Sequence, residues 1–156
     1  MPEPRELRIV QHLQTTLQAI TTGGGYFFTV PSGAVKLDPD HEVDALIQPD
    51  GPRPFVVLEL DEERFTYRPS LMVDILFPVK VHWVGQAPDE QDVSLLQTYF
   101  RGAADVEQAI AADITRGGLA QDTRIVGRDI AIRGREVRAL VDLEMLVHRN
   151  YGQPNG

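Results

Sequence analysis

The feature that most constrains the fold is a strict alternation of apolar and polar residues from Arg135 to His148. One set of alternating positions is entirely apolar and consists of Val137, Ala139, Val141, Leu143, Met145 and Val147. A period of two residues over this length is typical of a strand with one buried face, because a helix would scatter the same residues around its axis. We therefore predict a long strand whose apolar face needs a second layer of structure to cover it.

The opening segment is the best candidate for that layer. It reads RELRIVQHLQTTLQAI and places five apolar residues at helical spacing on one stripe, namely Ile9, Val10, Leu13, Leu17 and Ile20. Thr21, Thr22 and the glycines 23–25 follow, and they predict the end of this helix because glycine readily adopts left-handed backbone conformations.

A second helical region is predicted over residues 88–116, with Gly102 dividing it into two short helices. The first of them contains Val93, Leu96 and Phe100, and the second contains Val106, Ala109, Ile110 and Ile114. Acidic residues crowd the start of this region, where the helix dipole favours negative charge.

The remaining apolar runs predict shorter strands. These are Tyr26–Val30, Ala34–Leu37, Phe55–Leu60, an extended zone Phe65–Val84 broken into smaller strands at Pro69 and at Pro78, where a kink is expected, and two short strands at 124–126 and 130–132. Residues 38–54 hold four prolines and predict a surface loop, with a brief ordered piece at Val43–Ile47. Helices and strands are grouped, so we predict an α+β fold with a mostly antiparallel sheet packed against the N-terminal helix and the middle helix. A meander with helices on one face is preferred.

The length and composition of the chain limit the number of domains and the classes of partner that we expect. A chain of 156 residues is most simply one domain, 1–156, with the loop 38–54 and a flexible C-terminal tail at 151–156. No apolar run is long enough to span a bilayer, so we expect a soluble protein made in the cytoplasm. The net charge of -8 argues against a protein that grips nucleic acid, and the absence of cysteine excludes disulfides and thiolate metal sites.

The most specific enzymatic pattern is Pro49-Asp50 followed by Glu59-Leu60-Asp61, which is similar to the metal-dependent nuclease pattern of Pro-Asp and acid-x-Lys. Asp61 stands where that pattern has its lysine, and Pro49-Asp50 lies in PDGP, a common turn composition. An acidic strand end beside a turn is therefore the favoured interpretation.

Other candidate sites are also better explained structurally. The acidic cluster Asp38, Asp40, His41, Glu42 and Asp44 lacks the spacing of a calcium loop, and we interpret it as a solvated loop. The triple glycine follows a helix, whereas phosphate-binding glycines precede one. The four histidines are expected at the surface or in an interface. We predict no catalytic, cofactor-binding or metal-binding residue, and no enzyme.

The polar face of the long final strand is the better functional candidate. Two leucines interrupt its alternating charges, and the predicted subunit-interface residues are Arg138, Leu140, Asp142, Glu144 and Leu146. Trp83 and Tyr99 are expected to add exposed aromatic area. Mixed charge with isolated leucines is typical of a subunit contact, although it also fits a plain solvent face.

Three segments together resemble the tail terminator, or tail completion, proteins of tailed bacteriophages and their prophage or gene-transfer relatives. They are RELRIVQHLQTTLQAITTGGGYFFTV, the middle helix DVEQAIAADI, and ALVDLEMLVHRNYG with its polar tail. The resemblance covers most of the chain in layout, but the loop 38–54 and the segment 89–101 have no counterpart in it.

This resemblance implies a virion structural protein that forms a ring, commonly a hexamer, at the head-proximal end of the tail tube. The implied partners are copies of itself, the tail tube protein and a head-tail connector or neck protein, with DNA passing through the channel without specific binding. A head completion or neck protein of a phage, a cellular ring-forming adaptor and a metal-dependent nuclease are the alternatives.

Overall fold

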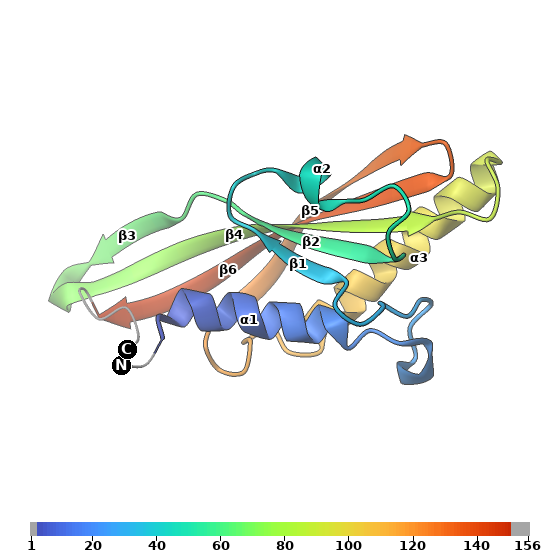
Figure 1. Cartoon of the computed structure of the whole chain (residues 1–156). Coiled ribbons are helices and arrows are strands. Elements are labelled where there is room, and N and C mark those ends of the chain that lie inside the picture. Colours follow the sequence, from blue (N-terminus) through green and yellow to red (C-terminus); the bar gives the residue numbers. More distant parts are fainter. Residues whose placement is uncertain (1–2, 151–156) are drawn as a thin grey trace.

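The computed structural model describes residues 3–150, and it confirms the predicted α+β class (Figure 1). Its helices are α1 (Arg5–Gln18), α2 (Val43–Leu46) and α3 (Asp92–Ala111). Its strands are β1 (Val35–Asp38), β2 (Phe55–Leu60), β3 (Arg64–Arg68), β4 (Met72–Gln86), β5 (Asp122–Arg133) and β6 (Glu136–Asn150). Two short 3-10 turns, η1 (Thr22–Gly24) and η2 (Pro69–Leu71), complete the described elements. The predicted tail 151–156 lies outside the described residues.

The strands form one six-stranded sheet in the order β1-β2-β4-β6-β5, with β3 also paired to β4. Every pair is antiparallel except β1 and β2, which run parallel. The predicted meander is therefore wrong at this edge. The loop between β1 and β2 carries α2 and returns the chain to its starting end, as a parallel pair requires.

The long final strand is confirmed and forms the centre of the sheet. All fifteen residues of β4, from Met72 to Gln86, have partners on β6, from Asn150 back to Glu136. The six alternating apolar side chains of β6 are each at most 1% exposed. This ladder gives the sheet one continuous apolar face.

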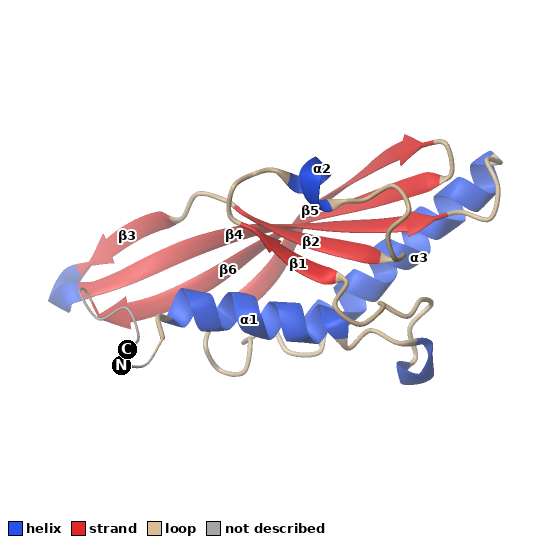
Figure 2. Cartoon of the chain, in the orientation of Figure 1, coloured by secondary structure: helices blue, strands red, loops and turns tan. Residues whose placement is uncertain are grey.

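Helices α1 and α3 cover that face, while the short α2 lies against the opposite one (Figure 2). The predicted stripe of α1 is confirmed for Ile9, Val10, Leu13 and Leu17, which are at most 3% exposed, and Ile20, which follows the helix, is buried as well. The predicted glycine stop is wrong, because α1 ends at Gln18 and the glycines form η1 and the turn after it. The Ile20 carbonyl instead accepts a hydrogen bond from the Val30 amide at 2.9 Å, which draws the chain away from the helix axis.

The predicted break at Gly102 is also wrong, since α3 is continuous from Asp92 to Ala111. A Cβ atom at Gly102 would lie 2.5 Å from the Trp83 ring, so the glycine permits close packing between α3 and β4. The predicted exposure of Trp83 and Tyr99 is also wrong: Trp83 lies beneath α3 at 0% exposure, and Tyr99 lies on the buried face of α3 at 7% exposure.

The segment Tyr26–Val30 is not the predicted strand. The Phe27 and Phe28 amides each donate to a carboxylate oxygen of Asp105 on α3, both at 2.9 Å, and do not form a strand ladder. The Phe28 ring packs on Trp83 with centroids 5.1 Å apart. The buried Asp105 carboxylate thus accepts the amide hydrogen bonds that a partner strand would otherwise accept.

No break occurs at Pro78, because β4 runs through it. The Pro78 carbonyl accepts from the Asp61 amide, so the proline nitrogen points to the same side of the strand. On that side β2 has ended at Leu60 and β3 begins only at Arg64, so no ladder bond is lost. The predicted break at Pro69 is confirmed by η2.

The two short strands predicted at 124–126 and 130–132 are one strand, β5. A bulge between Ile125 and Gly127 shifts its register against β6. The extra residue, Val126, interrupts the alternation that would have revealed a single strand in the sequence.

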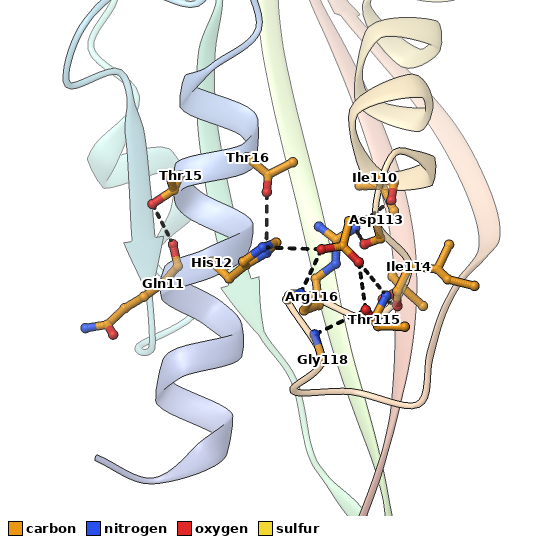
Figure 3. A network of polar contacts seen from close by, with 12 residues as sticks. Gln11, His12, Thr15, Thr16, Ile110, Asp113, Ile114, Thr115, Arg116 and Gly118 are labelled. Carbon is orange, nitrogen blue, oxygen red and sulfur yellow. Dashed lines mark hydrogen bonds and ion pairs between the residues drawn. The ribbon is translucent and has the colours of Figure 1, made fainter. Parts of the chain in front are cut away.

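A polar network ties the end of α3 to α1 (Figure 3). The buried Arg116 side chain donates to the carbonyls of Ile110 and Asp113, placing a cation at the negative end of the helix dipole. The Asp113 carboxylate accepts from the Thr115 hydroxyl at 2.8 Å and lies 3.6 Å from His12 on α1. Hydrogen bonds with Thr115 and Gly117 keep the pKa of Asp113 below its ordinary value.

We predict that Gly102→Ala destabilises the protein by about 1–3 kcal/mol, although alanine is the better helix former by roughly 1 kcal/mol. The added methyl group must displace the Trp83 ring. Urea unfolding followed by fluorescence of the single tryptophan measures the change. Gly23→Ala is the matched control, because a Cβ there meets nothing within 4 Å. A Gly102→Ala variant as stable as the wild type contradicts this packing.

Candidate functional site

The candidate site is the face of β2, β4, β5 and β6 opposite α1 and α3, which we call the outer face. All five predicted interface residues lie on it and are partly buried: Arg138, Leu140, Asp142, Glu144 and Leu146. Their strand, β6, lies between β4 and β5 and is not a sheet edge. Any contact made by these side chains is therefore made through the face.

Arg138 is already engaged within the chain. Its guanidinium lies 2.5 Å from Asp44 on α2 and 3.4 Å from Glu136. The hydrogen bond and charge of Arg138 keep the pKa of Asp44 below its ordinary value. Burial opposes the charge of Arg138, but its two acidic partners outweigh burial and raise its pKa. Arg138 thus anchors α2 to the sheet.

A carboxylate bridged by two histidines lies beside that anchor. Glu59 on β2 contacts His82 on β4 at 3.0 Å and His41, before α2, at 3.2 Å. His82 was expected at the surface or in an interface, and at 8% exposure it is not a surface residue. These residues line a hollow of about 340 Å³ with Arg138 and Leu140.

The electrostatics of Glu59 favour its ionised form. Burial raises the pKa of its carboxyl group, but hydrogen bonds with His82 and His41, together with the charges of His82 and Lys80, outweigh this and leave the pKa below its ordinary value. The ionised carboxylate joins β2, β4 and the segment before α2. Its evident role is to fix α2 on the outer face.

A second hollow of about 320 Å³ lies where β2 ends and β3 begins. It is lined by Asp61, Glu62, Arg64, Leu76, Pro78, Val79, Lys80, Val126, Asp142, Leu143 and Glu144. The charged residues of this open depression are of both signs, with Arg64 and Lys80 among four carboxylates. This mixture suits a protein surface better than a single charged ligand.

The nuclease pattern is not assembled. Asp50 lines a depression with Gln86 at one end of β4, whereas Glu59 pairs with Lys80, six residues along that strand. Six residues of strand span roughly 20 Å, too far for two carboxylates to share a metal ion. Within residues 3–150, no group of three or more His, Cys, Asp or Glu side chains is arranged to hold a metal.

The acidic loop is not simply solvated. Asp38 is 2% exposed, and one of its carboxylate oxygens accepts from the Asp40 and Glu42 amides. It therefore orders the turn that leads into α2. His41 in this turn has a left-handed backbone with φ 56°, a conformation that few non-glycine residues adopt.

Sequence reasoning missed one apolar surface. Val93, Leu96 and Phe100 were expected to form the apolar stripe of a short helix, yet they are 76%, 46% and 54% exposed. The buried face of α3 instead contains Leu95, Tyr99, Ala103, Val106 and Ile110. Apolar residues on two faces of one helix were the signal that one face would stay uncovered.

None of the described helices is long and apolar enough to cross a membrane. Comparison with protein-family models and with curated proteins found no match for this chain.

We predict that Glu59→Gln lowers the free energy of unfolding by about 1 kcal/mol at neutral pH, because the charge-assisted bonds to both histidines weaken. Since the folded state lowers the pKa of Glu59, its stabilisation is present above the ordinary value of 4.5 and is lost as pH falls through the lower folded value. Urea unfolding at several pH values should show the two proteins converging in acid. The exposed Glu62→Gln is the control. A difference that grows below pH 4.5 contradicts this linkage.

Proposed function

We propose that this chain is a virion structural protein of the tail terminator kind, which forms a ring on the head-proximal end of a phage tail tube. The observation that carries the proposal is the outer face, a broad sheet surface with charges of both signs and two leucines, which no long helix covers. Such a surface suits protein contacts. The confirmed α+β layout, with an N-terminal helix, a middle helix and a long final strand, is consistent with it.

The proposed mechanism is steric and cohesive. Neighbouring subunits join into a collar, one side of which matches the last ring of the tube and stops its polymerisation. The other side presents a joining surface for the head connector or neck protein. The net charge of -8 per chain suits a channel through which DNA slides without adhering.

We predict that the purified protein, mixed with phage tail tubes, decorates one tube end, as seen by negative-stain electron microscopy. The double variant Leu140→Gln with Leu146→Gln should lose most of this decoration, because both partly buried leucines lie on the outer face. Leu7→Gln is the matched control, since Leu7 is 38% exposed on α1 at the opposite face. Decoration of the head connector alone favours a head completion or neck protein, and decoration of neither contradicts both proposals.

We predict no cleavage of plasmid DNA in magnesium or manganese, with Glu59→Ala indistinguishable from the wild type. The physical reason is the separation of Asp50 and Glu59 along β4. Gel electrophoresis of the plasmid measures this. Metal-dependent cleavage that Glu59→Ala abolishes would establish the nuclease alternative instead.

A further inference from the structure

Strand β5 is an open edge of the sheet. Within the described residues it pairs only with β6, and eight of its twelve residues are exposed. Its sequence contains no proline, the residue that most directly prevents a strand from pairing. The backbone N–H and C=O groups along the free side of such a strand can bind a further strand.

The opposite end of the sheet is closed by the chain itself. Gln14 on α1 donates to the Val35 carbonyl of β1 at 2.9 Å, and Gln18 accepts from the Val35 amide at 3.3 Å. These two side chains bind the backbone groups that a further strand beside β1 would need. The sheet can therefore be extended at β5 and not at β1.

An exposed apolar row of α3 lies on the same flank of the molecule as β5. We call this row the α3 stripe, and it consists of Val93, Leu96 and Phe100. Glu107, seven residues after Phe100 and so on the same side of the helix, binds Arg128 on β5 at 3.0 Å. Asp105, which binds the segment 26–30, lies on the other flank of α3. The stripe therefore points toward the open edge of the sheet.

Two isoleucines of β5 continue this apolar surface. Ile130 pairs with Ala139 and Ile132 with Val137, and the side chains of both β6 residues are buried under the helices. Both isoleucines therefore lie on the same side of the sheet as α3. Ile132 is 45% exposed and Ile130 is partly buried. Together with the α3 stripe they leave one apolar flank uncovered.

The stripe and the isoleucines also lie at about one level of the sheet. The Trp83 ring meets α3 at Gly102, and Trp83 is joined through Ala139 to Ile130 in the ladder. Phe100 precedes Gly102 by two residues, which is roughly 3 Å along the helix. A strand that pairs with β5 at this level therefore approaches the flank of α3 that carries Phe100.

Two charges at the end of β5 have no ion partner. Asp129 and Arg133 alternate with the isoleucines and so lie on the outer face. Within residues 3–150 neither side chain forms an ion pair, and Asp129 accepts only from the amide of the following residue, at 2.8 Å. Arg138 already binds Asp44 and Glu136, the two acids beside Arg133. Both charges are therefore available to a second chain.

We propose that two copies of this chain pair their β5 strands antiparallel about a two-fold axis at Ala131, which makes one continuous sheet. In this register Asp129 lies opposite the partner's Arg133, and Arg133 lies opposite the partner's Asp129. Ile130 lies opposite the partner's Ile132 on the inner side. The same axis turns the two α3 stripes toward each other, so the second copy covers the apolar flank.

The charges select this register among the two-fold arrangements of β5. An axis at Arg128 or Asp129 places like charges opposite each other, which is destabilising. An axis at Ile130 or Ile132 places charged side chains opposite apolar ones. The axis at Ala131 pairs both available charges and both isoleucines.

This contact goes beyond the proposed function. A two-fold contact closes at two copies, so it joins pairs of chains and does not by itself build a collar. A failure of tube decoration would overturn the terminator role and leave the β5 dimer standing. Loss of the β5 dimer without loss of tube decoration would do the reverse.

Two charge variants test the pairing. Asp129→Arg and Arg133→Asp each place like charges opposite each other twice, and both positions are exposed, so both variants should fold. Light scattering over a concentration range should show that the wild type reaches twice the mass of one chain. Each variant should need roughly tenfold or more higher concentration to dimerise. Lys36→Asp, the same change of charge at an exposed position on β1, should dimerise as the wild type does.

The equimolar mixture of the two charge variants is the decisive measurement. Each chain then carries the charges that the other needs, so the mixture should form a heterodimer at the concentrations where the wild type dimerises. The double variant Asp129→Arg with Arg133→Asp reverses both pairs and should also dimerise. It replaces the mixture if tryptophan fluorescence shows that a single variant misfolds.

Phe100→Lys tests the helix side of the same contact. It places an ammonium group in each α3 stripe, where the two stripes face each other, and should weaken the dimer roughly tenfold or more. Leu7→Lys, at an exposed position on α1, is the control. A wild type that is monomeric at every concentration, a charge variant or Phe100→Lys that dimerises as the wild type does, or a mixture that stays monomeric overturns the two-fold contact.

Discussion

The pairing of β4 with β6 is the interaction on which the rest of the structure depends. Fifteen paired residues on each strand align two alternating apolar rows, and this common face is what α1 and α3 bury. The same alignment places the charged residues and leucines of β6 together on the outer face. It also carries both strands away from the body, where β3 pairs with β4 and the hairpin projects. The burial of one face of the β4–β6 ladder therefore determines which residues lie on the outer face and at the two ends of the ladder.

The sequence predicts an element well where one layer of packing decides it. β6 follows from its period of two and α1 from its helical stripe, because each meets the core on a single face. Local sequence patterns give a wrong prediction where a residue far away in the sequence determines the local structure. Gly102 predicts a helix break, but in the structure it makes room for the Trp83 ring and α3 continues through it. The segment 26–30 has the composition of a strand, but its amides at Phe27 and Phe28 donate to Asp105. Pro78 predicts a kink, but β4 changes its partner from β2 to β3 at this residue, so no hydrogen bond of the ladder is lost.

The candidate site was predictable to the same degree. Alternation alone assigns Arg138, Leu140, Asp142, Glu144 and Leu146 to one face, and the structure places them there. That α2 covers part of this face depends on Arg138 meeting Asp44, 94 residues earlier, and no local pattern reports such a contact. The burial of His82 depends likewise on Glu59 from another strand.

The charged groups and the exposed apolar groups of this chain differ in what they contact. Glu59, Asp105 and Arg138 each bind a separate segment of this chain, so their charges hold the fold together. The exposed apolar side chains have no such internal role. Leu71 is held outward by a left-handed turn, and the stripe led by Val93 lies on the uncovered side of α3. A folded chain gains nothing from exposing these groups to water, whereas contact with another protein removes them from it.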